Sequence, residues 1–190
     1  ADTVQEPVDK EIENETKVIS LIPQDKELKS LFIQSKKLAY ANEPEKAIAS
    51  FQRALKRADE VGDNETKSKV YYEVGKIYDD YDYYPQALTS YNNSLNTNDK
   101  NVKTKAHYAM AQIYDDVNQI QPAMDHYFNS ISFAGETENL TAQTTSLTKM
   151  GNILTDMYDD EAMNYISIAD DLAAQTDNSK LKGFVSSSMG

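Results

Sequence analysis

Apolar residues recur along this chain at intervals of three and four, the spacing that places side chains on one face of a helix. In one stretch, Val70 and Val74 precede a polar turn at residues 82–85, and Ala87 and Tyr91 follow it. The pattern therefore predicts two antiparallel helices joined by a short turn.

The same hairpin pattern occurs four times, with two marks in each copy. The first mark is a small residue, an aromatic residue or Ile four positions later, and Ala or Ser after three more: Ala47–Phe51–Ala54, Ala87–Tyr91–Ser94, Ala123–Tyr127–Ser130 and Ala162–Ile166–Ala169. The second mark precedes each triplet by 11 or 12 residues and pairs a small with a large apolar residue: Ser35–Leu38, Gly75–Tyr78, Ala111–Tyr114 and Gly151–Leu154. Two marks in matched order indicate an internal repeat.

The small residues in these marks predict close contact between helices. At Gly75 and Ala111, we expect the two helices of one hairpin to approach each other, and at Ala87 and Ala123 we expect the next hairpin to dock. A large side chain at such a position would force the backbones apart, at a cost of about 1–3 kcal/mol. We therefore expect these residues to be buried.

The order of Gly75, Tyr78, Ala87, Tyr91 and Ser94 resembles the tetratricopeptide (TPR) pattern, and the resemblance covers residues 28–185. The Trp often found early in the first helix of that pattern is absent, and the unit length is 36–40 residues instead of 34. In this respect the chain is similar to the longer variant of kinesin light chains and related bacterial scaffold and regulator proteins. The resemblance implies an all-α fold, a right-handed α-solenoid of antiparallel helix pairs.

We divide the chain into an N-terminal segment, four hairpins and a C-terminal piece: 1–27, 28–64, 65–100, 101–137, 138–178 and 179–190. The N-terminal segment is acidic, and we expect it to be mostly flexible, with a short capping helix over residues 12–22 as an equal alternative. Residues 187–190 resemble residues 148–151, which predicts the start of a fifth repeat in a longer solenoid. The alternative is a terminal capping helix with a polar outer face.

The charge of the chain excludes several kinds of partner. With a net charge of −12, the protein lacks the basic surface that nucleic acid or an anionic membrane requires. The absence of cysteine excludes disulfides, zinc–thiolate sites and thiol nucleophiles. No apolar run approaches the roughly 18 residues of a membrane span, and the acidic start is unlike a signal peptide. We therefore expect no membrane insertion and a cytoplasmic location.

Candidate catalytic residues are few. We expect His107 to be packed in the core and His126 to lie on the outer face of its helix, too far apart for a shared metal ion or base. The acidic run that begins at Asp79 fails as a calcium loop, because Tyr84 and Ser90 stand where an EF-hand needs Gly and Glu. We therefore predict no enzymatic activity, no metal site and no cofactor.

One helix face carries the candidate binding site. In the resembling fold the first helix of each hairpin lines a concave groove, and its inward positions repeat Lys around an aromatic residue. The predicted groove residues are Lys29, Phe32, Lys36, Lys69, Tyr72, Lys76, Lys105, Tyr108, Gln112, Thr145, Thr148 and Asn152. Lysine would pair with carboxylates and tyrosine would supply flat contact area. The alternative is that Lys stands there only as a soluble helix former.

These observations predict a protein–protein interaction scaffold or adaptor. Its groove would bind a peptide or protein segment that carries acidic groups beside an apolar anchor. A second hypothesis is the sensor or regulatory segment of a larger signalling protein, with an output domain outside this chain. A third is self-association through exposed solenoid ends.

Overall fold

The computed structural model describes residues 25–158 and 160–188, and the helix considered for residues 12–22 lies outside this part of the chain. The described residues form nine α-helices and no strand. The helices are α2 (Lys26–Tyr40), α3 (Pro44–Val61), α4 (Asn64–Asp79), α5 (Tyr84–Ser94), α6 (Lys100–Asp116), α7 (Ile120–Glu136), α8 (Leu140–Asp156), α9 (Ala162–Ala174) and α10 (Ser179–Ser186).

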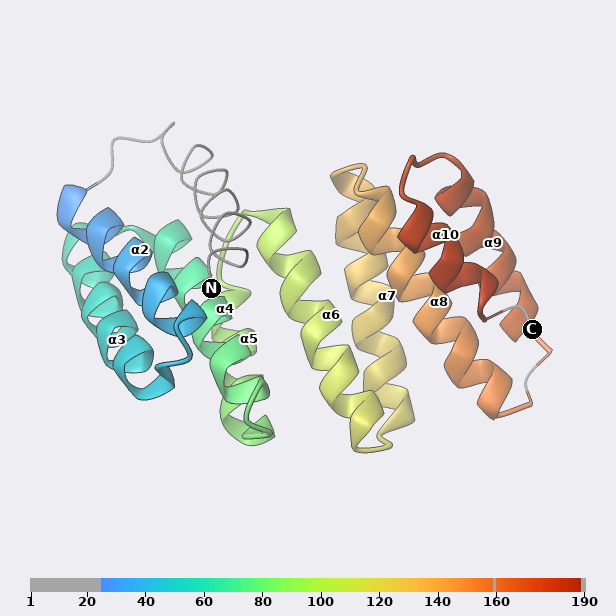
Figure 1. The fold of residues 1–190 in the computed structure, drawn as a ribbon, viewed down its shortest axis with the longest axis horizontal. Helices are drawn as coiled ribbons and strands as arrows, with labels where there is room; N and C mark the ends of the chain where they lie inside the picture. The colour runs from blue at the N-terminus through green and yellow to red at the C-terminus, as the bar shows by residue number, and fades with distance from the viewer. Residues whose placement is uncertain (1–24, 159, 189–190) are drawn as a thin grey trace.

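The helices pack as four sequential antiparallel pairs: α2 with α3, α4 with α5, α6 with α7, and α8 with α9 (Figure 1). Each pair packs mainly on its neighbours along the chain, and α10 packs against α8 and α9. Four successive apolar clusters fill the spaces between them. The core is therefore a continuous strip, as in other helical-repeat architectures.

The small residues of the repeat lie at the helix contacts, as predicted. Ala87 and Ala123 have no exposed surface. A β-carbon added to Gly75 would lie 2.6 Å from a ring carbon of Tyr91. At Gly151, the corresponding position of the fourth pair, an added β-carbon would lie 2.5 Å from Ile166. The fold therefore requires a residue without a side chain at both glycines.

The two helices of each pair begin differently. The first helices, which we call the A helices (α2, α4, α6 and α8), each start at an Asp or Asn whose side chain accepts a backbone N–H: Asp25, Asp63, Asp99 and Asn139. The second helices have no such cap, and α3 and α5 carry Pro44 and Pro85 in their first turn, where a backbone N–H has no helical partner. Asn178 caps α10 in the same way as the A helices are capped.

The links from α3 to α4 and from α7 to α8 each contain one residue with left-handed backbone, and this residue is Gly in the first link and Glu in the second. Gly62 follows α3 with φ +71°, and Asp63 then caps α4. Glu138 follows α7 with φ +53°, and Asn139 then caps α8. Left-handed backbone is unfavourable for residues with a β-carbon.

Replacing Glu138 with Gly is expected to raise the free energy of unfolding by about 0.5–1 kcal/mol. The gain is the strain removed minus the greater chain entropy of glycine in the unfolded state. Urea denaturation followed by circular dichroism measures it. Glu138→Ala, which shortens the side chain but keeps the β-carbon, is the control, and an equal gain from that variant would contradict the explanation.

Candidate functional site

The A helices α2, α4 and α6 lie side by side, because α4 contacts both α2 and α6. Lys69, Tyr72 and Lys76 lie on one face of α4, since they are three and four residues apart. The same positions of α6, 36 residues further on, hold Lys105, Tyr108 and Gln112. We call these six residues the A-helix face.

The two tyrosines of the A-helix face are held by aromatic contacts within their own helix pairs. The ring of Tyr72 packs on that of Tyr91, with centroids 5.6 Å apart. Tyr108 packs edge-on against Tyr127, with centroids 5.7 Å apart. Both A-helix tyrosines remain partly exposed, so each presents a ring that is fixed in position before a ligand arrives.

Two of the three lysines of the A-helix face, Lys69 and Lys76, lie close to carboxylates of the protein. Lys69 Nζ is 3.5 Å from a carboxylate oxygen of Asp99, and Lys76 Nζ is 3.7 Å from Glu73. The side chains of Lys69 and Lys76 are 26% and 42% exposed, and such pairs contribute only about 0–1 kcal/mol. Lys105 is exposed and forms no ion pair with a described residue. A carboxylate of a ligand can therefore compete for these ammonium groups at small cost.

The first helix pair differs from the second and third at the predicted groove positions. Lys29 is partly exposed, but Phe32 and Lys36 are buried, with 5% and 3% of their surface accessible. Phe32 packs edge-on against Phe51, and the Lys36 ammonium lies 3.3 Å from the carboxylate of Glu73 on α4. Lys36 therefore links two consecutive A helices, and a buried ammonium group needs such a partner.

The fourth helix pair supplies no charge at these positions. Thr145 and Asn152 are partly exposed, whereas Thr148 is fully buried and donates its hydroxyl to the carbonyl oxygen of Thr144 at 2.8 Å. The exposed lysines and tyrosines at the predicted positions are therefore concentrated on α4 and α6.

The structure also brings together two histidines that the sequence analysis placed apart. The Nδ1 atoms of His107 and His126 are 2.9 Å apart, so one ring donates a proton that the other accepts. The His126 ring stacks on Tyr114, and the His107 ring stacks on Phe133. Placing His126 on the outer face was wrong, because α7 turns that side chain towards α6.

A regular spacing could have revealed this contact. Facing aromatic residues in the hairpins, such as Tyr72 and Tyr91, are 19 residues apart, and His107 and His126 have the same separation. Burial is the main reason that the pKa of His107 is lowered to about 4, with His126 and Lys103 adding to the effect. Burial also lowers the pKa of His126. Both rings are therefore neutral near pH 7.

Two further observations concern metal ligands and helix hydropathy. They contain no group of three or more His, Cys, Asp or Glu side chains arranged to hold a metal ion. In the same part of the chain, every helix is too short or too polar to cross a membrane.

Sequential antiparallel helix pairs that contact one another through small residues define an α-solenoid of TPR-like helix pairs, and the predicted all-α fold is thereby confirmed. No protein-family model matches the sequence, and no curated protein matches it significantly. Solved structures do share the fold.

The structure of RapI in its apo form superposes with a TM-score of 0.71 at 15% identity, over 83% of this chain and 60% of that one. BtubC (BKLC) from P. vanneervenii superposes with a TM-score of 0.70 at 13% identity, over 97% of this chain and 82% of BtubC. Both are TPR-repeat proteins, so the predicted resemblance is confirmed for the fold. The chain spans 60% of the length of RapI. At this level of sequence identity, the two likenesses show the fold alone.

Proposed function

We propose that this chain is a non-enzymatic interaction scaffold that binds a segment of another protein on its A-helix face. The observation that carries the proposal is the repetition of a lysine and a fixed, partly exposed tyrosine on α4 and α6. Lys69 and Tyr72 recur as Lys105 and Tyr108, 36 residues later. In a protein with a net charge of −12, two neighbouring helices thus present cations and aromatic rings side by side.

The chemistry of the A-helix face selects the kind of segment that it binds. Lysine ammonium groups attract carboxylates and increase the rate of association with acidic partners. Tyr72 and Tyr108 offer rigid, flat surfaces that bury an apolar side chain at low entropic cost. The proposed ligand is therefore an extended or helical segment with Asp or Glu beside a Phe or Leu anchor.

The test replaces Lys76 and Lys105 with Glu together, because both side chains are exposed and neither caps a helix. The probe is a fluorescein-labelled peptide with glutamates on both sides of a Phe–Leu pair, and fluorescence anisotropy measures its Kd. We expect the double variant to bind at least about tenfold more weakly, because attraction becomes repulsion. We also expect wild-type affinity to fall as salt rises.

The matched control is Arg53→Glu with Lys56→Glu, which changes the net charge equally at exposed positions of α3. We expect this control to keep most of the wild-type affinity. Equal weakening in both double variants would reduce the effect to net charge and contradict the proposal. Undiminished binding by the Lys76 and Lys105 double variant would also contradict it.

A further inference from the structure

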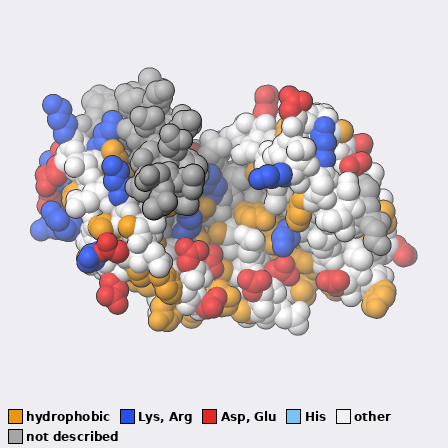
Figure 2. Space-filling model, viewed as in Figure 1, with side chains coloured by type: hydrophobic (Ala, Val, Ile, Leu, Met, Phe, Trp, Pro, Cys, Tyr) orange, Lys and Arg blue, Asp and Glu red, His pale blue; other side chains and the backbone are white. Residues whose placement is uncertain are grey.

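The turns within the four helix pairs lie along one edge of the molecule, which is the lower edge in Figure 1. All four turns contain a residue with left-handed backbone, at φ +56° to +59°: Asn42, Asp82, Asn118 and Tyr158. The residue before it is an exposed apolar one in three of them: Tyr81, Val117 and Met157. Figure 2 shows hydrophobic and acidic side chains gathered along this edge.

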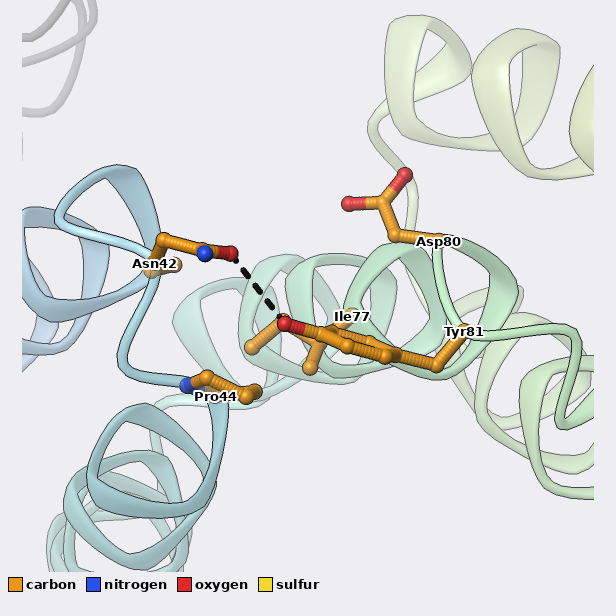
Figure 3. Close-up of a pocket in the computed structure, with 6 residues that line it drawn as sticks. Asn42, Pro44, Ile77, Asp80 and Tyr81 are labelled. Carbon is orange, nitrogen blue, oxygen red and sulfur yellow. Dashed lines mark hydrogen bonds between the residues drawn. The ribbon is translucent and has the colours of Figure 1, made fainter.

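An open pocket of about 440 Å³ lies between the first two turns (Figure 3). Ala39, Pro44 and Ile77 form its apolar lining, and Tyr81 and Asp80 stand beside them. The hydroxyl of Tyr81 donates to the Oδ1 atom of Asn42 at 3.1 Å, which fixes the tyrosine ring across the two turns. The volume is at the lower end of the range for ligand pockets, so it suits one or two side chains.

The pocket lies in a region of negative charge. The Asp80 side chain is exposed and makes no hydrogen bond or ion pair with a described residue. Its neighbour Asp79 accepts a hydrogen bond from the Tyr91 hydroxyl at 3.0 Å. The pKa of Asp79 is raised, first by burial and then by the charges of Asp80, Asp116 and Asp82. The carboxylates beside two consecutive turns therefore repel one another. A bound cation would reduce this repulsion.

We propose that this pocket binds an arginine side chain from an exposed basic segment of another protein. The aliphatic part of the arginine packs on Pro44 and Ile77, and its guanidinium group pairs with the Asp80 carboxylate while lying against the Tyr81 ring. A guanidinium group satisfies both contacts at once, because it is planar, pairs with carboxylates through two N–H groups and stacks on aromatic rings. A lysine ammonium group lacks the planar geometry.

This inference does not rest on the function proposed for the A-helix face. The pocket uses other residues and has the opposite charge preference, since it selects a cation and the A-helix face selects carboxylates. Together the two surfaces would allow the solenoid to hold two partners at once.

The test compares Asp80→Asn with Asp171→Asn, which remove one charge each from exposed positions. The probe is a fluorescein-labelled peptide of Gly and Ser around a central Leu-Arg-Leu, and its matched partner carries citrulline, an uncharged analogue, in place of arginine. We expect Asp80→Asn to weaken binding of the arginine peptide at least about tenfold. We expect Asp171→Asn to stay within about twofold of wild type.

Methyl NMR spectra locate the binding site independently, with the Ile77 and Ala39 signals expected to shift when the arginine peptide is added. Equal weakening by both variants, equal binding of the citrulline peptide, or shifts confined to other methyl groups would each overturn the proposal. Analytical ultracentrifugation without peptide tests whether a second copy of the chain fills the pocket. Self-association of the wild type that is lost in Asp80→Asn would show this, and that result would also overturn the proposal.

Discussion

Replacing Gly75 with alanine is expected to lower the free energy of unfolding by about 1–2 kcal/mol. The added β-carbon would lie 2.6 Å from the ring of Tyr91. That ring is buried, packs on Tyr72 and is tied through its hydroxyl to Asp79, so it cannot move aside cheaply. Overpacking costs about 1–3 kcal/mol, and a contact this short with a fixed ring belongs to the upper part of that range, about 2–3 kcal/mol. Subtracting the gain of about 1 kcal/mol from the better helix propensity of alanine leaves the expected net loss. Urea denaturation followed by far-UV circular dichroism measures the difference.

The matched control is Gly183→Ala in α10, where an added β-carbon meets no atom within 4 Å. At this position only the helix propensity changes, and we expect the free energy of unfolding to rise by about 0.5–1 kcal/mol. The two variants make the same chemical change and should therefore differ in sign. A stabilising Gly75→Ala would show that the contact between α4 and α5 is looser than the structure describes.

Acidification from pH 7 to pH 4 is expected to destabilise the protein through His107 and His126. The pKa of His107 falls from 6.5 to about 4 on folding, and that of His126 is also lowered. Between about pH 6.5 and pH 4, the unfolded chain therefore binds more protons than the folded chain. The contribution of the neutral histidines to the free energy of unfolding is present above about pH 6.5 and is lost as the pH falls towards 4. Solvent screening of these half-buried rings limits the loss to about 1–2 kcal/mol.

The surroundings of the histidine pair explain why protonation is resisted. Lys103 adds a positive charge near His107, Asp125 partly offsets the burial of His126, and the rings of Tyr114 and Phe133 cover the other sides. Two protonated rings with Nδ1 atoms 2.9 Å apart would also leave neither atom able to accept. The packing of α6 on α7 therefore depends on a neutral acceptor at this contact.

The His107→Gln, His126→Gln double variant separates this effect from the titration of carboxylates. Urea denaturation at several pH values gives the free energy of unfolding for both proteins. We expect the difference between wild type and double variant to shrink as the pH falls from 7 to 4. If the two stabilities fall in parallel, the histidines do not cause the acid sensitivity.

The fold could be predicted from the sequence because the repeat places small residues at the positions where helices contact one another. Ala87, Ala123 and Gly75 are small at matched positions, and close helix contact is the physical reason for small residues there. The aromatic residues Tyr91 and Tyr127 hold the same position of the repeat, and both are buried. Each of these inferences needed only the period of the repeat and helical geometry.

The contacts between different side chains were harder to predict. Lys36 was expected in the groove, but its pairing with Glu73 depends on the distance between α2 and α4, which periodicity does not give. The contact between His107 and His126 depends on the register of α6 against α7. That register could be inferred from the 19-residue separation of the facing tyrosines, once the first such pair is known.

The length of α5 bears on how the solenoid moves. Its 11 residues compare with 18 in α3 and 17 in α7, so the second helix pair presents the smallest surface to the pair that follows it. We therefore expect the solenoid to resist bending least at the junction of α5 and α6. Tyr72 and Tyr108 lie on opposite sides of this junction, so bending there would change the distance between the two rings.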